Sequence, residues 1–194
     1  MGYHFGEEHI TMHRIATFAL AASFGCLSLA AQGAAQPAAQ SAAAHSLTAE
    51  GKQLYTAIKT NLIKAAEKMP EESYAFKASP DIRTFGALIG HIADTQMRYC
   101  GMAQGTQKSV DAASKTSKAD LVAALKSSFD FCDAAWDATT DANAGDTVGA
   151  GRMQLARLTM LMRNTIHDNE EYGYLAVYLR IKGVVPPSSD RSTM

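Results

Sequence analysis

Three side chains of this sequence have the types and the spacing to bind one divalent cation. His167 and Glu171 stand four residues apart in a segment with helical periodicity. Residues at this spacing share one face of a helix, with their Cβ atoms about 5–6 Å apart. An imidazole nitrogen and a carboxylate oxygen on that face can reach the same ion, and a facing helix would have to complete the site. His91, from a separate segment, is the candidate for the third ligand.

His91 has the surroundings of an inward-facing residue. It shares a helical face with Leu88 and Thr95, which lie three residues before it and four residues after it. We therefore expect it to be buried or to line a cavity. Two simpler interpretations stay open: a hydrogen-bonded core histidine at His91, and an exposed pair on a solvated turn at His167 and Glu171.

Two nitrogen ligands and one oxygen ligand suit zinc, nickel or ferrous iron, with water in the open coordination positions. Such a site predicts a metal-dependent hydrolase or transferase, in which a water molecule or a thiolate is the nucleophile because the cation lowers its pKa. Glu171 could instead leave the metal and act as the general base, and no separate catalytic residue can be assigned. The polar side chains that could support the ligands or contact a substrate are Asn164, Tyr174, Tyr178 and Arg180.

Four helical segments would position these residues. Apolar residues recur at spacings of three and four over residues 48–69, 84–104, 117–136 and 153–182. No segment shows the convincing alternation of a half-buried strand. Four amphipathic helices without strands predict an all-α fold, a four-helix bundle.

The connections predict how these helices are joined. Pro70 ends the first helix, Thr84 can cap the second, and Ser117 with Asp120 has the spacing of a capping box at the start of the third. The first two helices, joined by a short Pro-containing connection, should be antiparallel neighbours. The longer polar segment 105–116 is long enough for a crossover. The predicted apolar stripe of the first helix comprises Leu54, Ile58, Leu62, Ala65 and Ala66.

Two segments resemble the DinB-like (DinB/YfiT-like) superfamily. They are residues 84–94, which contain Gly-His-Ile-Ala-Asp, and residues 167–187, which end in Gly-Val-Val-Pro-Pro. The resemblance extends over roughly residues 46–188 and implies an up-down-down-up bundle. The family's motif is one histidine on the second helix and a His-x-x-x-His pair on the fourth. His91 and His167 match its first two positions, and Glu171 stands where the second histidine of the pair is usual.

The resemblance implies a metal site and leaves its use open. Glu171 gives a set of two histidines and one carboxylate, or else marks a site that has decayed while the fold was kept. Characterised relatives include metal-dependent thiol transferases and a thiol-dependent isomerase, whose thiol cofactors are cytosolic. The alternative function is a non-catalytic periplasmic binding protein or a structural bundle with a degenerate metal site, for which a homodimer is one open oligomeric state.

Composition excludes one class of partner. The 194 residues are enough for one domain with a hydrophobic core, and 47% apolar against 19% charged residues is typical of a globular protein. The formal net charge is −1, and the lysines and arginines are scattered. No nucleic-acid partner is expected, because binding to a phosphate backbone needs clustered cations. We expect a small-molecule ligand or substrate of unknown identity instead.

The N-terminal residues have the order of a secretory signal peptide. Met12-His13-Arg14 supplies a basic start, residues 15–31 carry no charge, and small residues follow. We therefore expect residues 1–33 to be a signal region, with residues 1–11 upstream of the true start at Met12. A membrane anchor is the alternative, but the run is short of the ~20 strongly apolar residues of a span.

Export sets the expected organisation of the rest of the chain. The mature protein would be periplasmic or secreted, with no stable membrane span after signal cleavage. Residues 34–46 are rich in Ala, Gln and Ser and read as a flexible linker. Residues 47–187 would form the DinB-like bundle, and residues 188–194 a C-terminal tail.

Export also changes the interpretation of the cysteines. Cys26 would leave with the signal, so that Cys100 and Cys132 remain. Two cysteines in an oxidising compartment predict one disulfide. Two separate buried thiols are the alternative.

Overall fold

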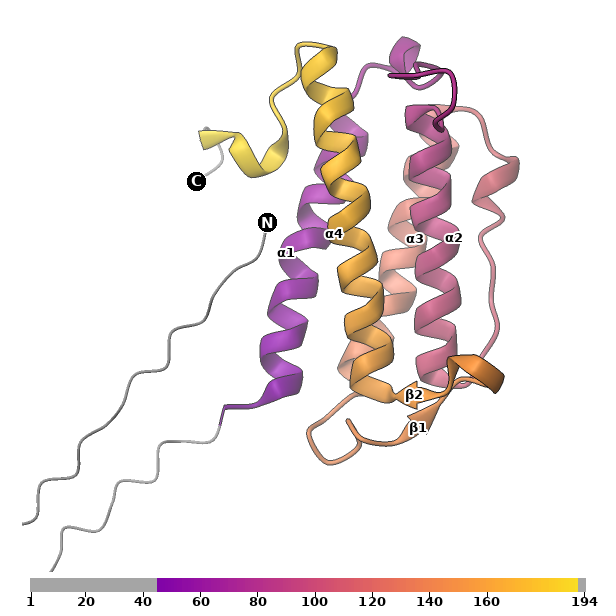
Figure 1. Cartoon of the computed structure of the whole chain (residues 1–194), viewed down its shortest axis with the longest axis vertical. Helices are drawn as coiled ribbons and strands as arrows, with labels where there is room; N and C mark the ends of the chain where they lie inside the picture. The colour runs from indigo at the N-terminus through magenta and orange to yellow at the C-terminus, as the bar shows by residue number, and fades with distance from the viewer. Residues whose placement is uncertain (1–44, 192–194) are drawn as a thin grey trace, which may run out of the picture. The chain divides into compact units, whose positions relative to one another are not determined.

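The computed structural model describes residues 45–191, which form a bundle of four α-helices (Figure 1). The helices α1 and α4 run in one direction and α2 and α3 in the other, so the predicted all-α, up-down-down-up bundle is confirmed. The predicted signal region 1–33 lies outside the described residues, as do residues 34–44 of the predicted linker and residues 192–194. The helices are α1 (Leu47–Lys68), α2 (Phe85–Gln104), α3 (Lys118–Asp137) and α4 (Arg157–Ile181).

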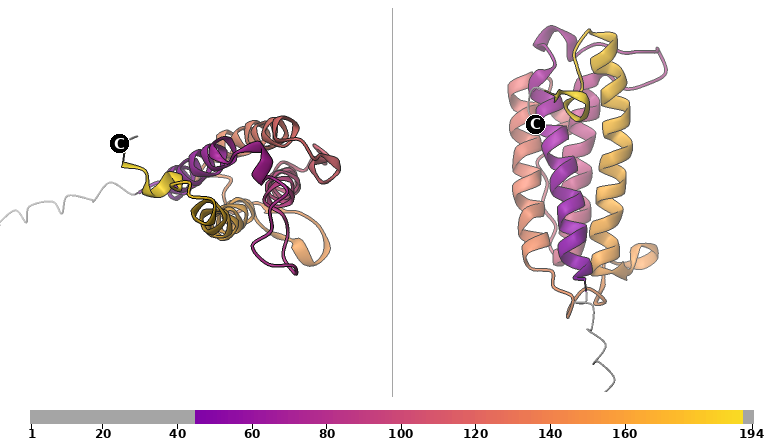
Figure 2. Two further views of the ribbon diagram at one scale, coloured as in Figure 1. Left: turned by 90° about the horizontal axis from the view of Figure 1, so that it is seen from above. Right: turned by 90° about the vertical axis from the view of Figure 1, so that its left-hand side faces the viewer.

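The packing of α1 and α2 differs from the expected one. Both helices pack against α3 and α4, so they face each other across the diagonal of the bundle (Figure 2). The prediction that they are neighbours was wrong. The 16 residues of 69–84 between them are enough to cross the end of the bundle, so no tight turn holds the two helices side by side. This arrangement makes α2 and α4 neighbours.

Side-chain caps fix where the first three helices begin. The hydroxyls of Ser46, Thr84 and Ser117 each accept a hydrogen bond from the backbone N–H three residues later, at 3.0–3.2 Å. Such caps satisfy one of the free N–H groups of the first turn. Thr84 and Ser117 therefore begin their helices as predicted.

The start of α4 differs from the predicted residue 153. Residues 147–156 form a short antiparallel pair of strands, β1 (Thr147–Val148) and β2 (Leu155–Ala156), with a 3-10 turn at Gly151–Met153 between them. This hairpin uses residues that we expected in the helix, which begins at Arg157. Two-residue strands are too short to show alternation in the sequence, which explains why none was expected.

The predicted crossover between α2 and α3 runs back along α2 (Figure 1). Its 3-10 turn, Ala112–Ser114, is held by Asp94, whose two carboxylate oxygens accept the N–H groups of Ala112 and Ala113 at 2.9 Å each. Gly90 makes room for this turn, because a Cβ there would meet the carbonyl oxygen of Ala112 at 3.0 Å. The crossover lets α2 and α3 run parallel and side by side.

The core contains most of the residues that the periodicity predicts. On α1 four of the five predicted positions are buried; Leu54 is 58% exposed, and Tyr55 is buried in its place. The Tyr55 hydroxyl shares its one hydrogen between the carboxylate of Asp133, at 2.8 Å, and the carbonyl of Phe129, at 3.1 Å. This aromatic side chain therefore links α1 to α3. The buried α3 residues are Leu121, Ala124, Leu125, Ser128, Phe129, Cys132, Ala135 and Trp136.

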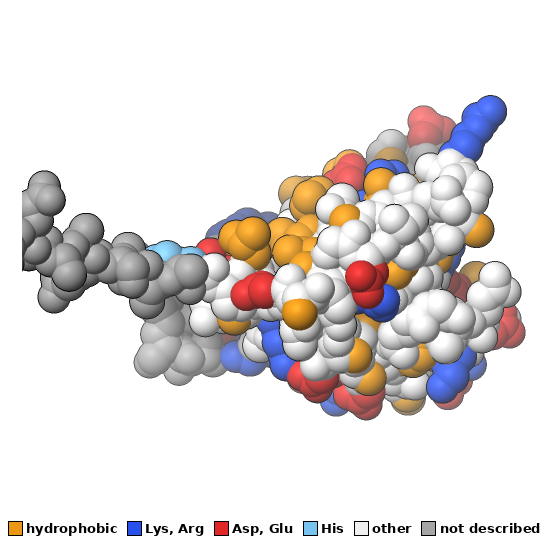
Figure 3. Space-filling model, turned by 90° about the horizontal axis from the view of Figure 1, so that it is seen from below, with side chains coloured by type: hydrophobic (Ala, Val, Ile, Leu, Met, Phe, Trp, Pro, Cys, Tyr) orange, Lys and Arg blue, Asp and Glu red, His pale blue; other side chains and the backbone are white. Residues whose placement is uncertain are grey.

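The described part of the predicted tail contacts the bundle. The hydroxyl of Ser188 lies 2.9 Å from that of Tyr172, and Lys68 pairs with Asp190 at 2.6 Å. Acidic and basic side chains are interspersed on the face seen from the end that carries β1 and β2 (Figure 3). None of the described helices has the length and apolarity to cross a membrane.

Candidate metal centre

His91 from α2 converges with His167 and Glu171 from α4 where these two helices pack together. The Nε2 atoms of the two histidines lie 3.2 Å apart, and each lies 3.5 Å from Oε1 of Glu171. The four-residue spacing in α4 puts His167 and Glu171 on one face, and the packing of α2 against that face supplies His91. The structure thus brings the three predicted ligand residues together.

The triangle formed by these three atoms has the size that one metal ion requires. Ligand atoms bound at ~2.0–2.1 Å with tetrahedral angles lie roughly 3.3–3.4 Å from one another. The observed separations are 3.2, 3.5 and 3.5 Å. A circle through the three atoms has a radius of about 2.0 Å, so one ion can reach all of them at ordinary bond lengths.

An unsatisfied oxygen points to the same conclusion. Oε2 of Glu171 is buried and has no hydrogen-bond partner among the described residues. A buried polar atom without a partner is costly, so such an atom calls for a partner from outside the protein. The chemistry of the donor set, two imidazole nitrogens and a carboxylate, suits a divalent cation. The three residues could therefore hold a metal ion.

The cluster lies at the edge of the core rather than at its centre. The side chains of His91, His167 and Glu171 are 31%, 19% and 7% exposed. Glu171 is the deepest of the three and lines a surface cavity between α4 and the segment that leads into α2. An ion at this position would have protein ligands on one side and coordination positions open to solvent on the other.

The surroundings adjust the protonation of two of these groups. Burial lowers the pKa of His91, and the positive charge of Arg83 lowers it further. Burial raises the pKa of Glu171, while His167 and Arg83 oppose that change. A lowered pKa keeps the imidazole of His91 in the neutral form that can ligate a metal. The raised pKa of Glu171 reflects the cost of burying a carboxylate, which a nearby cation would offset.

The structure adds a fourth residue, Asp168. It is fully buried, and its Oδ1 lies 3.9 Å from Nδ1 of His167. Its Oδ2 accepts a hydrogen bond from Nδ2 of Asn164 at 3.0 Å, and Asn164 also donates to Gln96. Burial raises the pKa of Asp168 to about 6. A buried polar chain thus runs from α2 to the back of the His167 ring and includes Asn164, one of the predicted supporting residues.

The sequence analysis did not predict the burial of Asp168. A signal was present, because Asp168 lies in the buried stripe of α4. That stripe consists of positions three or four residues apart, which is the spacing of an inward helical face. Its members are Leu161, Asn164, Thr165, Asp168, Tyr172, Leu175 and Leu179.

The other predicted polar residues lie at different distances from the cluster. Tyr174 is half exposed and lines the same cavity as Glu171. Tyr178 is buried and donates a hydrogen bond to the backbone carbonyl of Arg83 at 2.5 Å. Arg180 is exposed in the last turn of α4, more than two helical turns beyond Glu171, and the structure does not bring it to the site.

Cys100 and Cys132 form a disulfide between α2 and α3. Their Cα atoms are 5.2 Å apart, within the range of about 4.4–6.8 Å that a disulfide requires. Both residues are fully buried. The predicted pairing is present in the structure, and the crossover between α2 and α3 is what lets the two cysteines meet.

The comparisons with known proteins agree with this architecture. The crystal structure of a DinB-like protein from Bacillus cereus ATCC 10987 has a similar fold, with a TM-score of 0.62 and 19% sequence identity, and the match covers 73% of this chain and 96% of that one. No curated protein matches the sequence. The sequence profile of the DinB superfamily matches residues 53–175, which include all three candidate ligands. The chain therefore belongs to the DinB superfamily.

Proposed function

We propose that this protein binds one divalent metal ion through His91, His167 and Glu171 and uses it in a hydrolase or transferase reaction on a small molecule. The observation that carries the proposal is the triangle of ligand atoms, with sides of 3.2, 3.5 and 3.5 Å. The buried, unpartnered Oε2 of Glu171 supports it. Zinc, nickel and ferrous iron all accept two imidazoles and one carboxylate.

Each protein group has one task in this proposal. The two imidazoles, in their neutral form, and the Glu171 carboxylate hold the ion. Oδ1 of Asp168 lies 3.9 Å from Nδ1 of His167, and neither atom has a hydrogen-bond partner among the described residues. A small rotation of the ring would let Asp168 accept the Nδ1 proton, which would keep Nε2 unprotonated and directed toward the ion. Ligands on the protein side leave positions open toward the cavity beside Glu171, where a substrate would enter. A divalent cation supplies Lewis acidity there, because it lowers the pKa of a water or thiol and polarises carbonyl groups.

Elemental analysis tests the proposal. The mature protein, purified without a metal-affinity tag and incubated with zinc, nickel or ferrous iron, should retain one ion per chain after dialysis. His91→Ala and Glu171→Gln should lose it. Glu170→Gln is the matched control, because it removes an exposed carboxylate immediately before Glu171 in the same helix and should leave metal binding intact. Failure of the unmodified protein to retain any of the three metals would favour the structural bundle.

We also propose that the protein is exported to the periplasm or secreted. The support is the basic start, the uncharged run and the small residues that follow in the sequence, together with the Cys100–Cys132 disulfide, a bond typical of oxidising compartments. N-terminal sequencing of the exported protein should find a first residue between Ala31 and Ser46. A mature chain that retains Met12 or Cys26 would contradict the proposal.

A further inference from the structure

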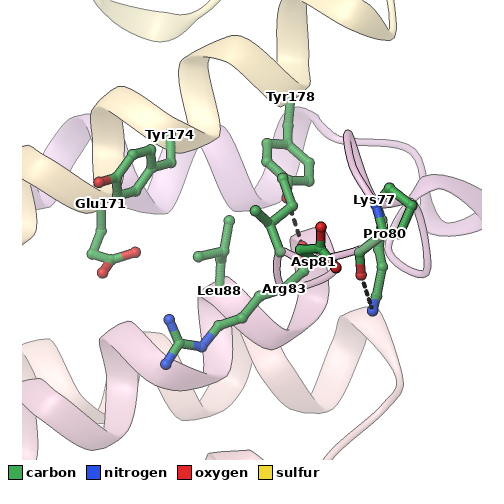
Figure 4. A pocket seen from close by; sticks show the side chains of 9 residues that line it. Lys77, Pro80, Asp81, Arg83, Leu88, Glu171, Tyr174 and Tyr178 are labelled. Atoms are coloured by element: carbon green, nitrogen blue, oxygen red, sulfur yellow. Dashed lines mark hydrogen bonds between the residues drawn. The ribbon is translucent and has the colours of Figure 1, made fainter.

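A cavity of about 670 Å³ opens beside the candidate metal centre (Figure 4). Its walls come from α4, from α2 and from the segment before α2, and they include Glu171, Leu88 and Tyr174. It is large enough for a small organic molecule. Of the three candidate ligands, Glu171 lines this cavity and His91 lines a neighbouring one. A molecule in the first cavity would therefore approach the ion from the Glu171 side.

Arg83 stands between this cavity and a second one. It lines the first with Glu171 and the second with His91. Its guanidinium makes no hydrogen bond or ion pair with any of residues 45–191. Asp81 lines the same cavity, but Figure 4 shows the Arg83 side chain extending away from it along α2, in the direction of Glu171. Arg83 therefore places a positive charge and unpaired N–H donors beside the candidate metal centre.

The backbone of Arg83 is held in place although its guanidinium is unpaired. Its carbonyl accepts the hydroxyl hydrogen of Tyr178 at 2.5 Å. The ring of Tyr178 is buried and packs against Phe85 and Phe76, with ring centroids 6.2 and 5.9 Å away. The next residue, Thr84, caps α2. An ordered backbone and an unpaired guanidinium suit ligand binding, because the backbone of Arg83 loses little conformational entropy when a ligand binds.

The charges around the cavity favour an anion. Lys77 and Arg83 line it with two positive charges, against one negative charge on Asp81. The charge of Glu171 would be neutralised by the bound cation. The planar guanidinium presents paired N–H donors that match carboxylate and phosphate oxygens, which a lysine ammonium cannot match in the same two-pronged way.

We propose that Arg83 and this cavity bind an oxyanion of the substrate, a carboxylate or a phosphate, while another donor atom of the same molecule reaches the metal ion. The inference rests on the proposed metal site and adds the chemical class of the substrate. Arg83 contacts the substrate and sets its orientation, and Tyr178 is a positioning residue that holds the segment from which Arg83 extends.

A binding experiment on the cobalt(II)-loaded mature protein tests this inference without any assay of activity. The probe is succinic acid monohydroxamate, whose hydroxamate reaches the metal and whose carboxylate reaches Arg83. The neutral comparison compound carries a primary amide in place of the carboxylate. The visible cobalt spectrum reports the binding of each. The carboxylate should bind at least about tenfold more tightly than the amide, the size of effect expected from a charge-assisted hydrogen bond.

Arg83→Gln should abolish the preference for the carboxylate and leave the affinity for the neutral amide unchanged. Arg98→Gln is the matched control: Arg98 is an exposed arginine of α2 whose charge also lowers the pKa of His91, but it does not line this cavity. It should keep the preference. An analogue that ends in a phosphonate identifies which oxyanion fits better, and its advantage over the amide should also vanish in Arg83→Gln.

The possible failures are distinguishable. A protein that gives no cobalt spectrum removes the proposed metal site and this inference with it. A protein that binds cobalt and the amide, but shows no preference for either anion, overturns the role of Arg83 and leaves the metal site standing. A preference that survives in Arg83→Gln overturns it as well.

Discussion

The carboxylate of Asp168 lies behind the imidazole of His167, with Oδ1 3.9 Å from Nδ1, while Nε2 of the same ring faces Nε2 of His91 at 3.2 Å. This separation is longer than a hydrogen bond, and neither atom has a hydrogen-bond partner among the described residues. If His167 binds a metal as proposed, a small rotation of its ring would let Asp168 accept the Nδ1 proton, orient the ring and raise the basicity of Nε2. Asp168→Asn should therefore weaken zinc binding about 10- to 100-fold, measured by competition with a chelating dye.

The control for Asp168→Asn must separate metal binding from folding. The substituted side chain keeps its shape and can still hydrogen-bond Asn164, so the circular dichroism spectrum should be unchanged. Glu170→Gln removes a carboxylate two residues away on the exposed side and should bind zinc normally. Equal zinc affinity in Asp168→Asn and the unmodified protein would show that Asp168 has a purely structural role.

Glu171 offers a second test, because it stands where a histidine is usual in the family motif. Glu171→His should retain a metal ion, since an imidazole nitrogen from the same position can take the place of Oε1. Glu171→Gln should lose most of the affinity, because a neutral amide is a weak ligand. Isothermal titration with zinc and with nickel measures both. Zinc binding by Glu171→Gln as tight as by the unmodified protein would remove Glu171 from the ligand set.

The pairing of His167 with Glu171 could be predicted from the sequence because it depends on local spacing, whereas His91 joins them only because α2 packs against α4. His167 and Glu171 share a face at any helix position, and His91 faces inward by its distance from Leu88 and Thr95. The burial of Asp168 was harder to predict from the sequence. Asp168 and Glu170 look alike in the sequence, and only the packing of α4 makes one fully buried and the other exposed.

The arrangement of the helices was only partly predictable for a related reason. Periodicity identifies helices and the caps set their starts, but a connection of 16 residues does not determine whether α2 lies beside α1 or across from it. The burial of Tyr55, where Leu54 was predicted, was not predictable for the same reason. Both positions lie three or four residues from Ile58, and the contact with Asp133 on α3 decides between them.

The disulfide should contribute measurably to stability. Cys100 and Cys132 are separated by 32 residues, and closing a loop of this size stabilises the folded state by about 3–4 kcal/mol in the chain-entropy model. Urea denaturation of the oxidised protein should give a correspondingly higher unfolding free energy than that of the protein reduced in denaturant and refolded under reducing conditions. Cys132→Ala should show no further loss on reduction. Two titratable thiols in the oxidised, denatured protein would refute the pairing.

Tyr55 predicts how stability depends on alkaline pH. Burial, and then the negative charge of Asp133, raise the pKa of its phenol well above the ordinary value of about 10. The folded state keeps this group protonated at a pH where the unfolded state ionises it. The stabilisation is therefore fully present below pH 10 and is lost as the pH rises above it, by up to about 1.4 kcal/mol per pH unit.

Tyr55→Phe should cost about 1 kcal/mol at pH 8, for the lost hydrogen bonds, and less at pH 11. Urea denaturation at pH 8, 9, 10 and 11 measures the difference, with Tyr174→Phe as the half-exposed control. A difference between Tyr55→Phe and the unmodified protein that stays constant with pH would show that the phenol ionises equally easily in both states.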